Sequence, residues 1–248
     1  EVLKASLSSP LRSEEARARD AWRHPVETLS FFGFKPSMNV VELASGSGWY
    51  TDVLAVATKA NNGTVVSSTF SPANPEPKYA KYAKMFDDKL ASAPEMYTNV
   101  KRGTLDPGSA IEIGEKNSAD MVVTFRNFHN WVSANTATDV IKSSFEVLKP
   151  GGVFGVVQHR AKENKPLAET AESGYLSETE LISLIEAGGF KLVEKSEVNA
   201  NPQDTANHPK GVWTLPPKLA LGDTEKAKYV AIGESDRMTL KFVKPAAE

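Results

Sequence analysis

Hydrophobic residues recur in short runs along the chain, and most runs alternate with longer amphipathic segments. Runs rich in β-branched residues are typical of buried strands, whereas apolar spacings of three and four are typical of helices. The pattern predicts strands at residues 39–43, 64–69, 98–104, 120–125, 153–158, 190–198 and 237–243. It predicts helices at residues 51–60, 79–91, 138–148 and 178–187. This alternation indicates an α/β fold, a Rossmann-like doubly wound and mostly parallel seven-stranded sheet.

We expect one domain with additions to its core. The expected parts are an N-terminal helical cap at 1–35, the core at 36–198, an insertion or lid at 199–233, and a last strand and tail at 234–248. In the cap, residues 1–12 are expected to be a polar lead, with helices at 13–22 and 26–32. The charged side chains along and just after the first of these helices are interpreted as a solvated face: Arg17, Arg19, Asp20, Arg23 and His24. Residues 161–175 are polar and are expected to form a cover.

The composition limits the kinds of molecule that this protein could bind. The 248 residues include 29 basic and 31 acidic side chains, a net charge of -2, which gives no electrostatic footprint for nucleic acid or an anionic membrane. The absence of cysteine excludes disulfides, thiolate metal sites and a cysteine nucleophile. No apolar run reaches the ~20 residues needed to cross a bilayer. We therefore expect a soluble protein that binds a small molecule, with no metal site.

The strongest local signal is the stretch at 40–51. An apolar strand reaches Glu42, continues into a small-residue turn with Gly46 and Gly48, and leads into a helix. Glycines let a backbone approach a ligand closely, and the unpaired N–H groups of a helix start can bind it. The pattern predicts a nucleotide-type cradle with Glu42 facing polar or cationic groups. Such a turn also serves merely to pack a helix close to a sheet.

Polar residues follow the later strands. Arg126, Asn127 and His129 come just after the 120–125 strand, and His159 comes just after the 153–158 strand. Because parallel strands end at one edge of the sheet, we expect these side chains near the cradle, although a lone histidine is also common as a structural residue. Asp106 follows the 98–104 strand, where it could cap a helix or contact a ligand base. Thr69 ends the second strand, where nucleotide-binding folds usually carry a ribose-binding acid.

Four motifs together resemble class I S-adenosylmethionine-dependent methyltransferases in their order and spacing. They lie at 40–50, 120–131, 147–152 and 185–190. The resemblance covers about residues 36–198 and includes the closing strand, which it implies to be antiparallel. Segments 17–25, 48–50 and 236–242 further resemble a bacterial branch of predicted methyltransferases that are often exported. Since the chain begins at Glu1, the resemblance implies a periplasmic or secreted protein if a signal peptide was removed, and a cytoplasmic one otherwise.

The resemblance implies S-adenosylmethionine as cofactor and a small-molecule methyl acceptor. The implied cofactor-binding residues are Glu42, Ala44, Gly46, Gly48, Trp49, Tyr50, Thr69, Asp106 and Asn127. His129 is the first candidate for a catalytic base and His159 the second. Ala44 stands where the family usually has glycine, and Thr69 stands where it has the ribose-binding acid.

Two alternatives follow from these departures. A methyltransferase-like binding protein would use the same cleft for another ligand without methyl transfer, and Thr69 favours it. A nicotinamide-dependent oxidoreductase is favoured less, because the turn lacks the full Gly-x-Gly-x-x-Gly order and the second strand lacks its acid.

Overall fold

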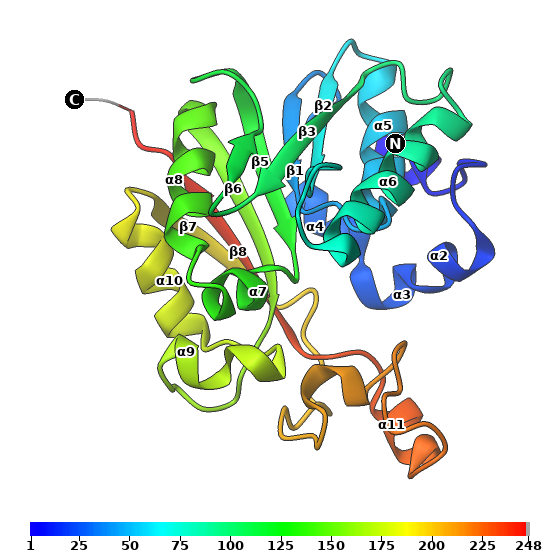
Figure 1. The fold of residues 1–248 in the computed structure, drawn as a ribbon, viewed down its shortest axis with the longest axis vertical. Helices are drawn as coiled ribbons and strands as arrows, with labels where there is room; N and C mark the ends of the chain where they lie inside the picture. Colours follow the sequence, from blue (N-terminus) through cyan, green and yellow to red (C-terminus); the bar gives the residue numbers. More distant parts are fainter. Residues whose placement is uncertain (247–248) are drawn as a thin grey trace.

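The computed structural model describes residues 1–246, and its centre is an eight-stranded sheet in the order β4-β3-β2-β1-β5-β6-β8-β7 (Figure 1). The strands are β1 (Asn39–Leu43), β2 (Thr64–Thr69), β3 (Val100–Asp106), β4 (Ala110–Glu112), β5 (Ala119–Phe125), β6 (Leu148–His159), β7 (Lys191–Ser196) and β8 (Arg237–Val243). Strands β3, β2, β1, β5 and β6 pair in parallel, β8 runs antiparallel to both neighbours, and β4 is antiparallel to β3. The predicted doubly wound fold is confirmed, with the short hairpin strand β4 added to the seven expected.

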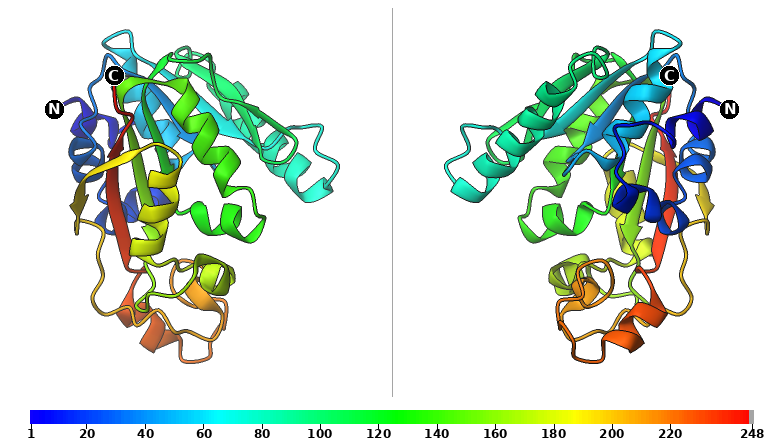
Figure 2. Two further views of the ribbon diagram at one scale, coloured as in Figure 1. Left: turned by 90° about the vertical axis from the view of Figure 1, so that its left-hand side faces the viewer. Right: turned by 90° about the vertical axis from the view of Figure 1, so that its right-hand side faces the viewer.

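Alternate residues of the central strands feed two hydrophobic cores, one on each face of the sheet. Val40 of β1 packs with helices α4 and α5, whereas its neighbour Val41 packs in the core that contains α7, α8 and α10. The pleat of a strand forces this alternation, and two apolar faces require helices on both sides. The two side views show the resulting three layers (Figure 2). These helices are α4 (Pro25–Phe31), α5 (Trp49–Lys59), α7 (Phe128–Ser133), α8 (Ala137–Val147) and α10 (Glu178–Ala187).

The N-terminal segment departs from its prediction. Residues 1–12 contain helix α1 (Val2–Ser6), which packs against α5. The single helix expected at 13–22 is two short helices, α2 (Glu14–Ala18) and α3 (Asp20–Arg23). Arg12 forms a bidentate ion pair with Asp20, which is part of the predicted solvated face. Tertiary contacts therefore override local propensity, which is a weak determinant in short helices.

The remaining helices match their patterns or fill the connections. Helix α6 (Pro77–Ser92) begins earlier than expected because Pro77 occupies its first position. Ser177 caps α10 by accepting a hydrogen bond from the Glu180 N–H. Residues 161–175 contain α9 (Leu167–Thr170) and the 3-10 turn η1 (Ala171–Ser173), which contact α7. No helix within residues 1–246 is long and apolar enough to span a bilayer.

The 199–233 segment lies beyond the carboxyl edge of the parallel strands, at the bottom of Figure 1. It contains the 3-10 turn η2 (Gly211–Thr214) and helix α11 (Lys226–Ile232). Its anchor is Asp204, a buried carboxylate that accepts hydrogen bonds from the Tyr175 hydroxyl (2.9 Å), His208 Nε2 (2.8 Å) and the Asp236 N–H (2.8 Å). Because every partner is a donor, this network is electrostatically satisfied and fixes the segment on the sheet edge.

Candidate functional site

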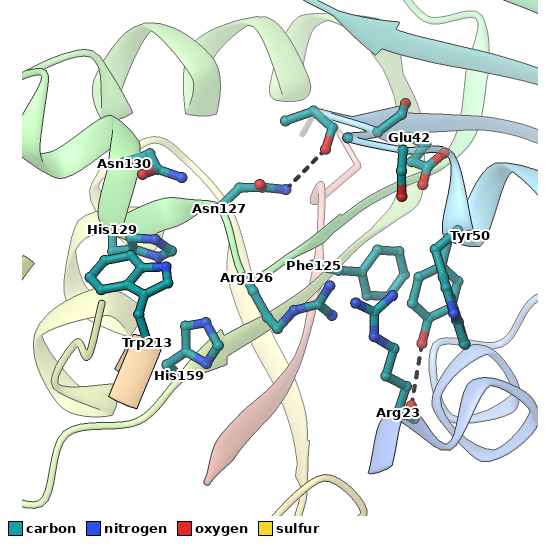
Figure 3. A pocket seen from close by; sticks show the side chains of 15 residues that line it. Arg23, Glu42, Tyr50, Phe125, Arg126, Asn127, His129, Asn130, His159 and Trp213 are labelled. Atoms are coloured by element: carbon teal, nitrogen blue, oxygen red, sulfur yellow. Dashed lines mark hydrogen bonds between the residues drawn. The ribbon is translucent and has the colours of Figure 1, made fainter. Parts of the chain in front are cut away.

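A cavity of about 340 Å³ opens at the carboxyl edge of the sheet, between the turn after β1 and the segment after β5 (Figure 3). Residues far apart in sequence reach it, from Arg23 of α3 to Trp213 of η2. The position agrees with the rule that open α/β sheets bind ligands at the strand carboxyl ends, where neighbouring connections diverge to opposite faces.

The turn after β1 has a left-handed backbone at three of its residues. Ala44, Gly46 and Gly48 have φ of 51°, 58° and 80°. No atom lies within 4 Å of a Cβ built on Gly46, which lines the cavity, whereas a Cβ on Gly48 would lie 2.7 Å from the Lys89 side chain of α6. Gly46 therefore leaves room for a ligand, while Gly48 lets two helices pack together. Ala44 carries strain that a glycine there would lack.

Glu42 is a buried acid beneath this turn. Its carboxylate accepts hydrogen bonds from the Thr51 hydroxyl and, at 3.0 Å, from the Ser67 hydroxyl. Burial raises the pKa of Glu42 to about 7, despite these hydrogen bonds. Among residues 1–246, no basic group forms an ion pair with it. A ligand cation is the missing partner that would make the charged form favourable.

Aromatic rings wall one side of the cavity. Tyr50 and Phe125 stack in parallel with centroids 3.5 Å apart. Trp49 donates its indole N–H to the Ala16 carbonyl (3.0 Å), and the Arg23 guanidinium lies 4.5 Å from the Trp49 ring centroid. These contacts attach the N-terminal helices to the turn and bring Arg23 into the cavity.

Two arginines next to the cavity share one acid. Arg19 forms a bidentate pair with Glu234 (2.9 and 2.7 Å), and Arg237 donates to the same carboxylate at 2.6 Å. Burial opposes ionisation of Glu234, but the two guanidinium groups outweigh it and lower its pKa to about 2. The Glu234 carboxylate is therefore paired with two arginines that do not line the cavity.

The two arginines that line the cavity lack such a partner. Arg23 is 7% exposed, and its Nε is buried without a hydrogen bond. Within the described chain, no acid pairs with Arg23 or with Arg126, whose guanidinium groups lie side by side in Figure 3. Burial and then repulsion from Arg19 lower the pKa of Arg23 to about 9, and burial and then Arg23 lower that of Arg126. The centre of the cavity is thus rich in uncompensated positive charge.

Hydrogen bonds determine the tautomer of His129. Gln158 Nε2 donates to the Gly174 carbonyl at 2.9 Å and lies 3.2 Å from His129 Nδ1. A flipped amide would set oxygen against the Gly174 carbonyl oxygen, so Nε2 donates to both atoms. Nδ1 of His129 is therefore an acceptor and Nε2 carries the hydrogen. Burial lowers the pKa of His129 to about 4, so the ring is neutral at pH 7.

The tautomer of His159 is also set by a hydrogen bond at Nδ1. Its Nδ1 lies 2.5 Å from the Ser235 hydroxyl oxygen, which also accepts a hydrogen bond from Arg237 Nε (3.1 Å). The buried Ser235 hydroxyl hydrogen needs an acceptor, and among the described residues Nδ1 is the acceptor within reach, so we assign Ser235 as the donor and place the ring hydrogen of His159 on Nε2. Burial lowers the pKa of His159 well below 6.5, and the nearby Arg237 lowers it further. Both histidines are thus neutral rings with an N–H at Nε2.

Two further residues connect the cavity to its surroundings. Asn127 Nδ2 lies 3.1 Å from the Thr124 hydroxyl, 3.3 Å from the Leu43 carbonyl and 3.4 Å from the Ala44 carbonyl. It therefore joins the ends of β1 and β5. Trp213 of the insertion packs edge-on against His129 with centroids 5.8 Å apart. The insertion thus forms the outer wall beside the histidines.

Thr69 and Asp106 lie outside this cavity. Thr69 is buried at the end of β2. The Asp106 carboxylate accepts hydrogen bonds from the Ser71 N–H (3.2 Å) and from the Asn74 side chain (2.8 Å). Asp106 therefore holds the loop that follows β2. Gly48 also lies outside the cavity lining.

The cavity unites eight of the predicted site residues: Glu42, Ala44, Gly46, Trp49, Tyr50, Asn127, His129 and His159. Sequence reasoning did not name Arg23, Phe125 or Trp213 as site residues, and it gave Arg126 no role. Its position directly after a buried strand had already placed Arg126 in the polar cluster with Asn127 and His129. Arg23 was assigned to a solvated face, which its burial contradicts. Trp213 lies in a segment without hydrophobic periodicity, so only the tertiary structure brings it to the site.

Comparison with known proteins rests on structure alone. No protein-family model matches this chain, and a search of curated proteins also finds no match. An S-adenosylmethionine-dependent methyltransferase from Aquifex aeolicus is similar over 98% of this chain and 96% of its own, with 16% identity and a TM-score of 0.61. A geranyl diphosphate methyltransferase in complex with S-adenosylmethionine is similar over 97% of this chain and 94% of its own (13% identity, TM-score 0.57).

The fold also occurs with a different chemistry. The [4+2]-cyclase SpnF is similar over 97% of this chain and 86% of its own, with 16% identity and a TM-score of 0.64. At these identities the likeness establishes the shared Rossmann-like fold. Activity has to be argued from the residues of the site.

Proposed function

We propose that this protein is an S-adenosylmethionine-dependent methyltransferase that acts on a small molecule. The main observation behind this proposal is that Glu42 is buried beneath a left-handed turn. Its partners within the protein are hydroxyl groups. The ammonium group of the methionine end is a cation that fits it. The methyltransferases of the same fold support the proposal. A small acceptor is favoured over nucleic acid or a membrane because the net charge is -2.

The methionine end of the cofactor fits the residues present. Glu42 would bind the ammonium group, Gly46 and Ala44 would let the backbone approach, and Arg23 would bind the carboxylate. Tyr50 and Trp49 would form an aromatic wall, where a sulfonium gains cation–π attraction. At the ribose, Thr69 offers one hydroxyl in place of two carboxylate oxygens, and Asp106 is already bound to the loop after β2.

The bound cofactor would supply an electrophilic methyl group, so the protein has mainly to orient the acceptor and exclude water. His129, His159 and Trp213 line the part of the cavity farthest from Glu42 (Figure 3) and would hold the acceptor. A base at either histidine would have to accept a proton at Nε2, which already carries hydrogen in both rings. We therefore assign both rings as hydrogen-bond donors to the acceptor.

A binding protein without methyl transfer is the second candidate. The observation that favours it is the nucleoside end, where Thr69 replaces an acid and the Asp106 carboxylate is engaged. The occurrence of the same fold in a [4+2]-cyclase also supports a departure from methyl transfer. In this case the cavity would bind another ligand under the 199–233 segment.

Thermal unfolding with S-adenosylhomocysteine tests the proposal. A ligand that binds only the folded state must raise the melting temperature, so a concentration-dependent rise is expected. No shift at millimolar ligand would contradict the cofactor assignment.

The variant Thr69→Asp separates the two candidates. Loss of S-adenosylhomocysteine affinity would mean that the pocket is adapted to threonine, as a working methyltransferase requires. A gain would indicate a decayed ribose site and favour the binding protein. Thr64→Asp is the matched control, since it makes the same change at the exposed start of the same strand. Each affinity is measured by calorimetry.

A further inference from the structure

The cavity contains more positive charge than its own residues balance. Arg19 and Arg237 share the Glu234 carboxylate, so that acid is not available to Arg23 or Arg126. The buried acid that lines the cavity, Glu42, lies near the end of β1 and accepts hydrogen bonds from hydroxyl groups. Arg23 and Arg126 therefore repel each other in a partly buried space without a carboxylate between them.

The proposed cofactor does not remove this excess. S-adenosylmethionine carries a sulfonium, an ammonium and one carboxylate, so it adds a net positive charge to the cavity. Its ammonium can pair with Glu42, and its carboxylate can pair with Arg23, which lies on Trp49 next to the turn. Arg126 would then remain unpaired. The second molecule in the cavity has to bring negative charge.

The remaining wall offers hydrogen-bond donors. His129 and His159 each carry hydrogen at Nε2, because their Nδ1 atoms accept from Gln158 and Ser235. A neutral imidazole N–H can donate to an oxyanion, and a neighbouring arginine can donate to it as well. These hydrogen bonds are strong because the oxyanion, and in the second case also the arginine, is charged. Arg126 lies between these histidines and the Glu42 end of the cavity (Figure 3).

From this arrangement we propose that the methyl acceptor is an organic oxyanion, a carboxylate or a phosphate, and that Arg126 is its main ligand with the Nε2–H groups of His129 and His159 beside it. This assignment of the anion as acceptor rests on the proposed function. The anion site itself rests on the unpaired guanidinium and the two ring tautomers. Arg23 has a different role, since it binds the carboxylate at the cofactor end.

The test is a titration of the purified protein with anions at pH 7.5 and constant ionic strength. The melting temperature is measured at each anion concentration. Sodium benzoate is the carboxylate probe and sodium phosphate the phosphate probe, with sodium chloride as the reference. We expect one probe to raise the melting temperature by roughly 3 to 6 °C at ten times its Kd. A response to benzoate alone indicates a carboxylate acceptor, and a response to phosphate alone indicates a phosphate acceptor.

Arg126→Gln is the decisive variant and Arg102→Gln is its matched control. Arg102 is an arginine outside the cavity with its guanidinium bound to Asp87 and to the Thr69 carbonyl. Arg126→Gln should weaken binding of the responding anion about ten- to hundredfold, the effect of losing a charged hydrogen-bond partner. Arg102→Gln should leave the anion affinity unchanged. Equal affinities in wild type and Arg126→Gln, or equal losses in both variants, would overturn the proposal.

A parallel titration with S-adenosylhomocysteine separates this inference from the proposed function. If S-adenosylhomocysteine binds and neither anion does, the oxyanion acceptor is wrong while the cofactor assignment stands. If an anion binds through Arg126 and S-adenosylhomocysteine does not, the anion site stands and the methyltransferase proposal is wrong.

Discussion

Two polar clusters at the same sheet edge differ in how their charges are satisfied. The anchor of the insertion, around Asp204 and Asp236, pairs each buried carboxylate with donors, among them Tyr175 and Arg160. In the cavity, Glu42 has no cation and Arg126 has no anion among the described residues. Charged groups withdrawn from water cost stability when they lack partners, so they persist where a ligand supplies the partner. The cluster around Asp204 and Asp236 therefore stabilises the fold, whereas the cavity is suited to binding a ligand.

Breaking the satisfied cluster should have the largest effect. Asp204→Ala removes a buried acceptor and leaves the Tyr175 hydroxyl and the Asp236 N–H without a partner. The free energy of unfolding in urea should fall by roughly 3–5 kcal/mol. The control is Asp223→Ala, an exposed acid in the same insertion, which should change it by less than about 0.5 kcal/mol. Similar losses in both variants would contradict the anchoring role.

Glu42→Gln should act in the opposite direction. Burial raises the pKa of Glu42 from 4.5 to about 7, so the folded state binds this proton more tightly than the unfolded state. The stability contributed by protonated Glu42 is therefore complete below pH 4.5 and is lost as pH rises toward 7. The amide oxygen can still accept from Thr51. At pH 8, Glu42→Gln should be about 1–3 kcal/mol more stable than wild type, and this gain should vanish near pH 4.5.

Urea unfolding of both proteins from pH 4.5 to pH 8 measures this difference. A gain that is constant across the range would show that the effect comes from packing and not from the proton. The same variant should bind S-adenosylhomocysteine more weakly, because it lacks the charge for the ammonium group.

Arg126→Gln and Arg102→Gln compare how an unpaired and a paired arginine contribute to stability. Without ligand, Arg126→Gln relieves repulsion from Arg23 and should gain up to about 1 kcal/mol, a modest value because the Arg126 residue keeps part of its surface in solvent. Arg102→Gln should lose stability, because it removes an ion pair with Asp87 and a hydrogen bond to the Thr69 carbonyl. Thermal unfolding at pH 7.5 checks both signs. Destabilisation by Arg126→Gln would mean that Arg126 already has a structural partner.

Ala44→Gly is expected to have the smallest effect. Ala44 has φ of 51°, a conformation that costs an alanine about 1–2 kcal/mol, but glycine loses more entropy on folding by about 0.5–1 kcal/mol. The net gain should be about 0.5 kcal/mol. The control Ala60→Gly, at φ of -67°, has no strain to relieve and should lose stability in the same thermal unfolding assay. If Ala44→Gly is the less stable of the two, the turn is not strained.

The sequence by itself determined the fold. Buried strands must be apolar and helices on a sheet must be amphipathic, so the pattern predicted β1, β2 and β8 at their observed boundaries and the sheet class. Position after a strand also predicted that Glu42, Asn127, His129 and His159 would meet at one edge, because parallel strands end together.

Only the tertiary structure decided which of these groups are satisfied. Glu234 pairs with Arg19 across most of the chain, Asp106 binds the loop after β2, and Gln158 sets the tautomer of His129. Such pairings depend on side-chain directions and distances of a few ångströms, which periodicity does not encode. The charge left unpaired at Arg126 is therefore visible only in the folded molecule.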